Sequence, residues 1–383
     1  MAKVKEALST RRGKWICFSA LAFVVLGLVL GLALGLTLGR ENNSSSAANK
    51  PNEPSGNPYP SPVTMNGTIP NNTDWVTLDP CLIRRESDSK LFLFTTGNTD
   101  APNGTVWTAD SLYGPWEKQS EPMVDKESGA PQVYNVNGTY YMYYQTHTFN
   151  YSTIGVNNSD AYQYNHDASI YVRTSPTMEP GNWTDYGRLN ITWQEEYNIL
   201  DASLLTIDNN TEAGLDRYYL TFGSYQTGIY QVPMADPPIE VGDNSLNETR
   251  HLEQNATSIA DSNDLTEGAF QYYRDGYYYL FFSSGICCPF ENDWAQGIAK
   301  PYHVMVCRSE NPRGDFVDKD GTDCLNDSGG TQILATHKGV FVPGGQGVFD
   351  DEEIGTILYY HYGKSTPTNK CLSPRPSADN RYF

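Results

Sequence analysis

The chain has 383 residues, including 27 Tyr and 14 Phe, and its formal net charge at pH 7 is −19. This length suits two average domains or one large all-β domain. Six basic groups and one acidic group lie in the first 40 residues, so residues 41–383 carry 20 basic and 44 acidic groups, a net −24. Such an acidic segment repels phosphate backbones, which excludes a nucleic-acid partner, whereas a neutral glycan meets no such repulsion.

An uncharged, apolar run extends from residue 15 to residue 39. It is long enough to cross a bilayer as a helix, for which about 20 residues suffice. Five basic residues precede it, so the positive-inside rule places residues 1–14 in the cytosol. We predict a retained transmembrane signal anchor at 15–39 rather than a cleaved signal peptide, because no Ala-x-Ala pattern follows the run. Residues 40–74 are rich in Asn, Ser and Pro and predict a disordered, flexible stalk.

The composition after residue 40 is typical of the secretory pathway. Fourteen Asn-x-Ser/Thr sequons lie there, as expected for a glycoprotein surface. Six of the seven cysteines lie outside the apolar run and permit three disulfides in fifteen connectivities. These features predict a single-pass type II membrane protein of the secretory pathway or cell surface, with the remainder of the chain lumenal or extracellular.

From residue 75 onward, short aromatic or β-branched runs are separated by Gly, Asp and Asn, without helical periodicity. Turn signals such as Asn137-Gly138 and Asp275-Gly276 directly precede Tyr-rich runs and predict hairpins. Five recurring units over 75–383 average about 62 residues each, somewhat longer than common propeller repeats. We predict an all-β fold, a five-bladed β-propeller over 75–383, with a two-sheet jelly roll as the alternative.

Three acids stand at the expected starts of innermost strands in separate units: Asp79, Asp201 and Glu267. In a propeller, such positions converge at one end of the central channel. Carboxyl groups that share a desolvated site push their pKa values apart, which yields one protonated acid and one ionised base. Hydrolysis of a glycosidic bond needs this division. Each acid alone is more simply interpreted as a turn residue, so the hypothesis depends on the repeat.

The segments around these acids resemble glycoside hydrolase family 43, most closely its endo-1,5-α-L-arabinanases. The resemblance spans roughly residues 75–383 and rests on motifs that occur in the family's order. They are Leu78-Asp79-Pro80, Ala130-Pro131-Gln132-Val133, Asn198-Ile199-Leu200-Asp201-Ala202-Ser203, Phe222-Gly223-Ser224-Tyr225, and Glu267-Gly268-Ala269-Phe270.

The resemblance implies an inverting hydrolase that cleaves α-1,5-L-arabinan, a pectin side chain, in carbohydrate catabolism. It implies that Asp79 is the general base, that Glu267 is the general acid, and that Asp201 tunes and orients the acid. We expect a polysaccharide substrate, arabinan or arabinoxylan, and a monomeric protein. The expected substrate-binding residues are Trp75, Phe94, Gln132, Ser224 and Tyr225, with Trp107 as a further aromatic candidate.

The chain departs from the family pattern at several positions. Gln132 replaces an Asp that is usual there, and Gly345 stands where arabinanases often have a His that holds a central cation. His361 in the following strand is only a weak substitute. We therefore expect that no cofactor is required, and the sequence leaves a calcium site open without predicting it.

Two alternatives to an endo-acting arabinanase remain. A β-xylosidase or α-L-arabinofuranosidase of the same family would need a blocked pocket rather than an open groove. A propeller whose altered site binds glycans without cleaving them is the competing class.

Overall fold

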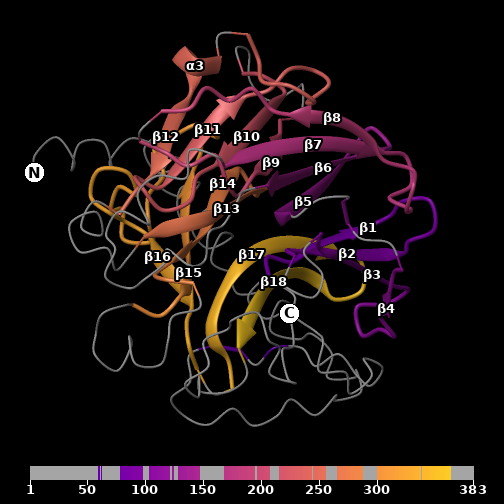
Figure 1. Cartoon of the computed structure of the whole chain (residues 1–383). Helices are drawn as coiled ribbons and strands as arrows, with labels where there is room; N and C mark the ends of the chain where they lie inside the picture. Colours follow the sequence, from indigo (N-terminus) through magenta and orange to yellow (C-terminus); the bar gives the residue numbers. More distant parts are fainter. Residues whose placement is uncertain are drawn as a thin grey trace, which may run out of the picture. The chain divides into compact units, whose positions relative to one another are not determined.

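The computed structural model in Figure 1 describes the chain in segments that all lie in residues 56–383, one of two units into which the chain divides. The predicted cytosolic tail, the predicted span at 15–39 and Trp75 lie outside the described residues. Within the described segments, no helix is long and apolar enough to cross a membrane. The described segments are 59–60, 62, 78–97, 103–120, 123–124, 128–146, 168–194, 196–207, 215–243, 245–255, 265–287, 300–337 and 339–363.

The described residues form antiparallel sheets and one short helix, α3 (Ser245–Glu248). Four sheets have four strands each, and each is built from strands that follow one another along the chain. The strands are β1 (Cys81–Arg84), β2 (Leu91–Thr95), β3 (Thr105–Ala109), β4 (Glu117–Lys118), β5 (Gly129–Val136), β6 (Thr139–Thr146), β7 (Ser169–Ser175), β8 (Thr184–Arg188), β9 (Ser203–Thr206), β10 (Tyr218–Phe222), β11 (Ile229–Pro233), β12 (Arg250–Glu253), β13 (Thr266–Arg274), β14 (Tyr277–Ser284), β15 (His303–Ser309) and β16 (Thr331–Leu334).

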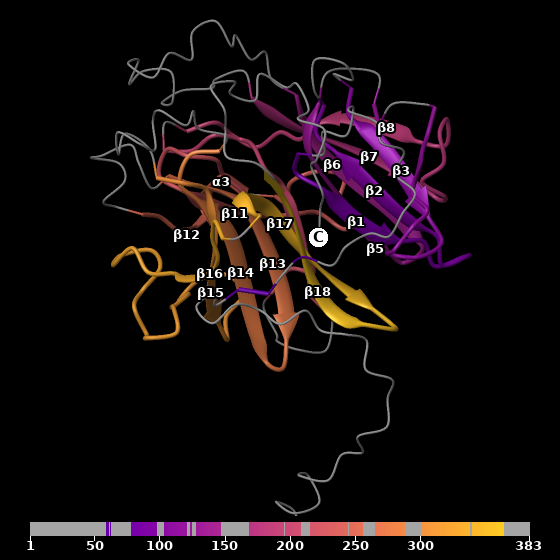
Figure 2. The same cartoon turned by 90° about the horizontal axis from the view of Figure 1, so that it is seen from below.

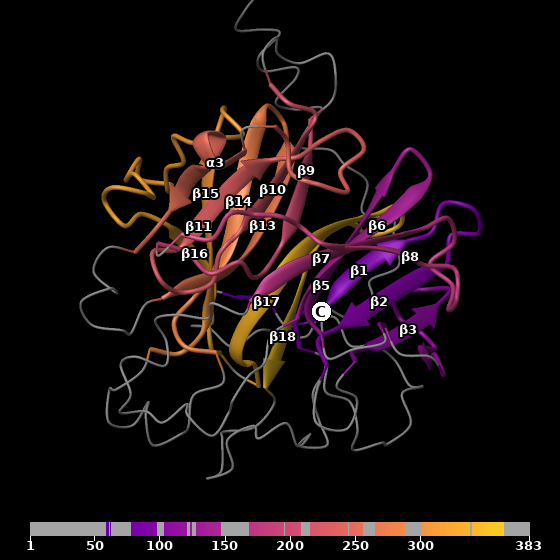
Figure 3. The same ribbon diagram turned by 45° about the horizontal axis from the view of Figure 1, so that its top comes forward.

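A fifth sheet has only two strands, β17 (Phe341–Asp351) and β18 (Gly355–Gly363). The prediction of five blades is therefore wrong: the described residues form four four-stranded blades and one hairpin. Figures 2 and 3 show this hairpin between the β13–β16 sheet and the β1–β4 sheet, and β17 contacts strands of both. Two long strands suffice there because the hairpin packs apolar side chains against each neighbouring sheet.

The innermost strands β1, β5, β9, β13 and β17 contact one another in sequence, and β17 contacts β1 again. Separate apolar clusters fill the spaces between neighbouring sheets. Tyr143, Tyr219 and Phe222 in these clusters are fully buried. Burial of a side chain of this size stabilises the fold by roughly 1.5–3 kcal/mol. The jelly-roll alternative does not describe this arrangement.

The local sequence explains the hairpins. Asn137-Gly138 and Asp275-Gly276 join paired strands, with Val136 opposite Thr139 and Arg274 opposite Tyr277. All four turn residues have positive φ, which Asn, Asp and Gly tolerate better than other residues. Both predicted hairpins are confirmed.

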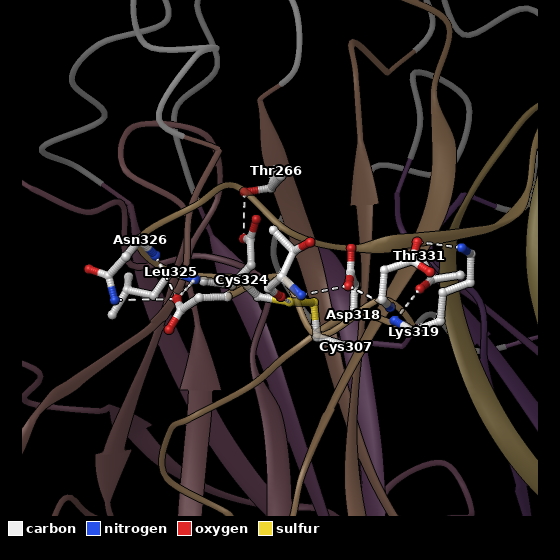
Figure 4. Close-up of a disulfide and its surroundings, with 12 residues drawn as sticks. Thr266, Cys307, Asp318, Lys319, Cys324, Leu325, Asn326 and Thr331 are labelled. Carbon is white, nitrogen blue, oxygen red and sulfur yellow. Dashed lines mark hydrogen bonds and ion pairs between the residues drawn. A yellow bond between two sulfur atoms is a disulfide. The ribbon is translucent and has the colours of Figure 1, made fainter.

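One disulfide lies beside the outer part of the β13–β16 sheet and is shown in Figure 4. It joins Cys307 on β15 to Cys324, which lies 17 residues further along the chain. Cys324 and its neighbours form a loop in which the Asp323 carboxylate accepts hydrogen bonds from the amides of Leu325 and Asn326. The disulfide therefore closes a loop that is also held by local hydrogen bonds.

We expect the double substitution C307A/C324A to lower the free energy of unfolding by about 3 kcal/mol, because closing a loop of this length restricts the unfolded chain. Urea unfolding monitored by tryptophan fluorescence measures the change. C81A, which removes a buried thiol outside the disulfide, is the control for loss of sulfur alone. Equal stability of the double variant and the wild type would contradict the structural role of this disulfide.

Candidate active site

The sheets share one backbone feature at the starts of their innermost strands. In each sheet, a residue that lies just before the innermost strand or among its first five residues has a left-handed φ between 40° and 64°. These residues are Asp79, Ala130, Asp201, Gly268 and Gly345. Two of the three predicted acids therefore occupy equivalent positions, but Glu267 lies one residue before the left-handed Gly268. The acids match across the repeat less closely than the sequence suggested.

Side chains near the ends of the second strands hold these left-handed residues. Because the first two strands of a sheet are antiparallel, the end of the second strand lies beside the start of the first. At four of the five junctions between sheets, such a side chain accepts a hydrogen bond from the left-handed residue of the next sheet. These four side chains are named the junction acceptors, and the bonds are Ala130 N–H to Thr96 Oγ1 (2.8 Å), Asp201 N–H to Gln145 Oε1 (2.6 Å), Gly345 N–H to Ser283 Oγ (3.0 Å) and Asp79 N–H to His361 Nδ1 (3.1 Å).

The remaining junction, from the β9–β12 sheet to the β13–β16 sheet, uses the acids themselves. The Gly268 amide donates to Asp201 Oδ2 at 3.1 Å, and the Ser224 hydroxyl donates to Glu267 Oε2 at 2.6 Å. Two of the predicted acids are thus connected to each other through a peptide unit. Ser224 follows the second strand of its sheet, as the junction acceptors do.

The side chain of Asp79 is 32% exposed. The Thr96 hydroxyl donates to its Oδ2 at 2.6 Å, and Oδ1 lies 3.5 Å from His361 Nδ1. Thr96 also accepts the Ala130 amide, so one hydroxyl joins the carboxylate to the next sheet. Asp79 is therefore held in place while part of its carboxylate faces solvent.

Glu267 has a different environment. Burial raises its pKa to about 7, hydrogen bonds from Ser224 and Tyr302 oppose this rise, and the charge of Asp79 adds to it. The Tyr302 hydroxyl donates to Oε1 at 2.8 Å, so each carboxyl oxygen has a donor. Tyr225 also hydrogen-bonds to this carboxyl group. Glu267 can therefore hold a proton at mildly acidic pH.

Burial also raises the pKa of Asp201 well above its usual range, and the charges of Glu267 and Asp79 raise it further. The three acids thus lie near enough to influence one another electrostatically. Two carboxyl groups whose raised pKa values favour protonation, next to the carboxyl group of Asp79, supply candidates for a proton donor and a proton acceptor. This arrangement can perform general acid–base chemistry.

The structure places the predicted substrate-binding residues in different environments. Ser224 and Tyr225 contact Glu267, whereas Gln132 lies half-buried on β5, two residues beyond Ala130. Phe94 is 1% exposed and packs in the core between two sheets, so its prediction as a sugar platform is wrong. Trp107 is likewise buried in a core cluster. Trp75 lies outside the described residues.

Sequence reasoning missed Thr96, Gln145, Ser283 and Tyr302. A signal existed for the first three, because each is a polar residue that ends an aromatic or apolar second strand. Tyr302 precedes β15 in a segment without any such pattern. Its ring stacks on His361 with centroids 5.9 Å apart and planes 9° apart, so it lies between Glu267 and the residue that holds Asp79.

The described residues do not fit a central cation held by protein side chains. No group of three or more His, Cys, Asp or Glu side chains among them is arranged to hold a metal ion. A Cβ at Gly345 would lie 2.6 Å from His361 Nδ1 and 2.8 Å from Asp79 Oδ1, so these side chains fill the space that a residue larger than Gly would need. His361 Nδ1 already accepts the Asp79 amide.

Comparison with known proteins defines the class. Residues 75–379 match the model of glycosyl hydrolases family 43, and the chain belongs to this family. The chain is 38% identical over 301 residues to arabinan endo-1,5-alpha-L-arabinosidase A of Aspergillus niger, which covers 76% of this chain and 83% of that protein. It is 40% identical over 297 residues to the protein of the same name from Aspergillus aculeatus, with 75% and 82% covered.

Solved structures share the fold. The alpha-L-arabinanase of Cellvibrio cellulosa is similar with a TM-score of 0.59 and 21% identity, covering 77% of this chain and 90% of that one. An exo-1,5-alpha-L-arabinanase from a bovine ruminal metagenomic library has a TM-score of 0.60 and 21% identity, covering 81% and 93%. At this identity the likeness concerns the fold alone.

We expect S224A to raise the pKa of Glu267 above about 7, because the substitution removes a hydrogen bond that favours the charged form. The shift should be about one pH unit, since a charge-assisted hydrogen bond contributes roughly 1.5 kcal/mol. NMR titration of a carboxyl-labelled Glu267 measures it.

S309A is the matched control, because Ser309 accepts the Asn311 amide in a turn after β15. The pKa of Glu267 in S309A should equal that in the wild type. An unchanged or lower pKa of Glu267 in S224A would contradict the hydrogen bond's role.

Proposed function

We propose that this family 43 glycosidase hydrolyses α-1,5-L-arabinan within the polymer and inverts the anomeric configuration. The single observation that carries the reaction is Glu267, whose pKa is raised to about 7 and which lies near enough to Asp79 to be affected by its charge. The substrate assignment draws on family membership and on the names of the relatives at 38–40% identity. A neutral arabinan also suits the net charge of −24 over residues 41–383.

In the proposed reaction, Asp79 accepts a proton from water as the water oxygen attacks the anomeric carbon. The glycosidic bond breaks at the same time, and Glu267 gives its proton to the departing sugar oxygen. Each turnover leaves Asp79 protonated and Glu267 charged, and exchange with solvent restores both. Thr96 and His361 hold Asp79, while Ser224 and Tyr302 hold the two oxygens of Glu267.

Asp201 acts through Glu267 in this proposal. Its carboxylate accepts the Gly268 amide, which fixes the backbone next to the acid. The charge of Glu267 raises the pKa of Asp201 by repulsion between like charges, so ionisation of one carboxyl group opposes ionisation of the other. Asp201 is therefore a positioning and tuning residue without a direct part in bond cleavage.

The alternatives make different products. A β-xylosidase or α-L-arabinofuranosidase would release monomer from aryl glycosides, and a binding propeller would retain the polymer uncleaved. Short oligomers from linear arabinan are the result expected here. The intact set of hydrogen bonds to Glu267 favours the enzyme over the binding protein.

We also propose that the catalytic domain lies in the lumen or outside the cell and acts as a monomer. Five sequon asparagines among the described residues are exposed, as glycan attachment requires: Asn137, Asn182, Asn190, Asn247 and Asn326.

We expect E267Q to lower kcat on linear arabinan by about 10²–10⁴-fold, because the amide cannot give up a proton to the leaving oxygen. The wild-type kcat should fall as the pH rises through about 7, where Glu267 loses its proton. Reducing-end assays over a pH series measure both effects.

Polymer retention on native affinity gels checks binding and should be the same for E267Q and the wild type. E253Q is the matched control, since Glu253 is also buried but hydrogen-bonds to Thr266 rather than to the site residues. It should leave the kcat unchanged. A wild-type kcat in E267Q would contradict the assignment of Glu267 as the general acid. A fall in the kcat of E267Q as the pH rises through about 7 would contradict it as well.

A further inference from the structure

We propose that His361 is a positioning residue for Asp79, and that its Nδ1 atom fixes the left-handed backbone from which the Asp79 carboxylate is aimed. This inference rests on the proposed function, in which Asp79 is the general base. It assigns His361 to the support of the base and not to a cation.

The geometry of His361 defines its protonation. Its side chain is 5% exposed, and Nδ1 accepts the Asp79 amide hydrogen at 3.1 Å. An accepting Nδ1 carries no proton, so the proton of the neutral ring is on Nε2. Nε2 is buried and has no hydrogen-bond partner among the described residues. The polar contacts of this buried ring among the described residues are therefore those of Nδ1 with Asp79.

Asp79 needs such support because its backbone conformation is unfavourable. Its φ is 47°, in the left-handed region that residues other than Gly seldom adopt. The next residue is Pro80, and a residue before proline is restricted to extended conformations. Conformations of this kind persist where the surroundings hold them, at a cost of about 1–3 kcal/mol each. The hydrogen bond to His361 is the contact that holds the amide of this residue.

A second junction of the same kind supports this interpretation. Ala130 also has a left-handed φ, precedes a proline and donates its amide to a junction acceptor, Thr96. The acceptor for Asp79 differs in being a rigid ring that has little freedom to move. On one side the ring stacks on Tyr302, and on another the absence of a side chain at Gly345 leaves it just enough room.

The contacts of the ring also connect the two reacting acids. Tyr302 stacks on His361 and donates its hydroxyl to Glu267, so the ring that holds the base packs against the residue that holds the acid. A displacement of His361 would therefore change the separation between Asp79 and Glu267. Inverting glycosidases need that separation to admit a water molecule.

The test compares H361A with H361N. We expect H361A to lower kcat on linear arabinan about 100-fold, as a displacement of about 1 Å in a reacting group does. The KM should change less than about threefold, because Asp79 acts in the transition state rather than in ground-state binding. H361N places an acceptor oxygen at the same number of bonds from Cα as Nδ1. The kcat of H361N on linear arabinan should therefore be at least about tenfold higher than that of H361A.

H251A is the matched control for removing a stacked, partly buried histidine. His251 on β12 stacks on Tyr230 at 4.2 Å and contacts the Thr227 carbonyl, away from the three acids. It should lower stability and leave kcat as in the wild type. An H361A kcat within about threefold of wild type, or an H361N kcat as low as that of H361A, would overturn the positioning role.

D79N separates this inference from the proposed function. Loss of arabinan hydrolysis in D79N together with an active H361A contradicts the role of His361 alone, whereas an active D79N or an inactive wild type contradicts the proposed function. Amide hydrogen exchange at Asp79 gives a readout that does not depend on activity. Exchange should be faster in H361A and slow again in H361N, and equal rates in H361A and wild type would overturn the inference.

Discussion

The hydrogen bond between the left-handed residue of an innermost strand and the neighbouring sheet is the interaction on which the site depends. Each innermost strand has a left-handed residue within it or just before it, and at four junctions the amide of that residue is bound by a junction acceptor. The bond satisfies a backbone donor that would otherwise be costly to bury. It also fixes the direction in which the adjacent side chain projects. Acids that are more than 60 residues apart in sequence thereby lie near enough for their charges to interact.

The same constraint separates the roles of the acids. Asp79 is held by its backbone and by Thr96, and 32% of its side chain is exposed. Asp201 and Glu267 are joined through Gly268 and are buried, which favours the protonated form. Desolvation of Glu267 thus provides the protonated acid that the proposed reaction needs next to Asp79.

Much of the fold could be predicted from the sequence because hairpin signals are local. Asn137-Gly138 and Asp275-Gly276 specify their turns through backbone conformation, and the strands around them were expected. The number of blades was wrong because the repeat marks the starts of innermost strands and not the number of strands that follow. The segment around Gly345 carries the repeat that marks an innermost strand, but its sheet consists of only two strands, β17 and β18.

The site was predictable to the extent that its residues follow the repeat. Asp79 and Asp201 do so directly, and Glu267 does so with an offset of one residue. Phe94 was misassigned because every residue of β2 is buried, so no alternation shows which face of the strand a side chain occupies. Tyr302 was not predictable, since its contact with Glu267 arises from packing between segments without a pattern.

The central claim is that Asp79 and Glu267 act from opposite sides of the scissile bond with water as the nucleophile. Proton NMR of the anomeric signals during the first minutes of linear arabinan hydrolysis tests it most directly. We expect the new reducing ends to appear first as the β-anomer and then to equilibrate. Initial formation of the α-anomer would show retention of configuration and would contradict the account.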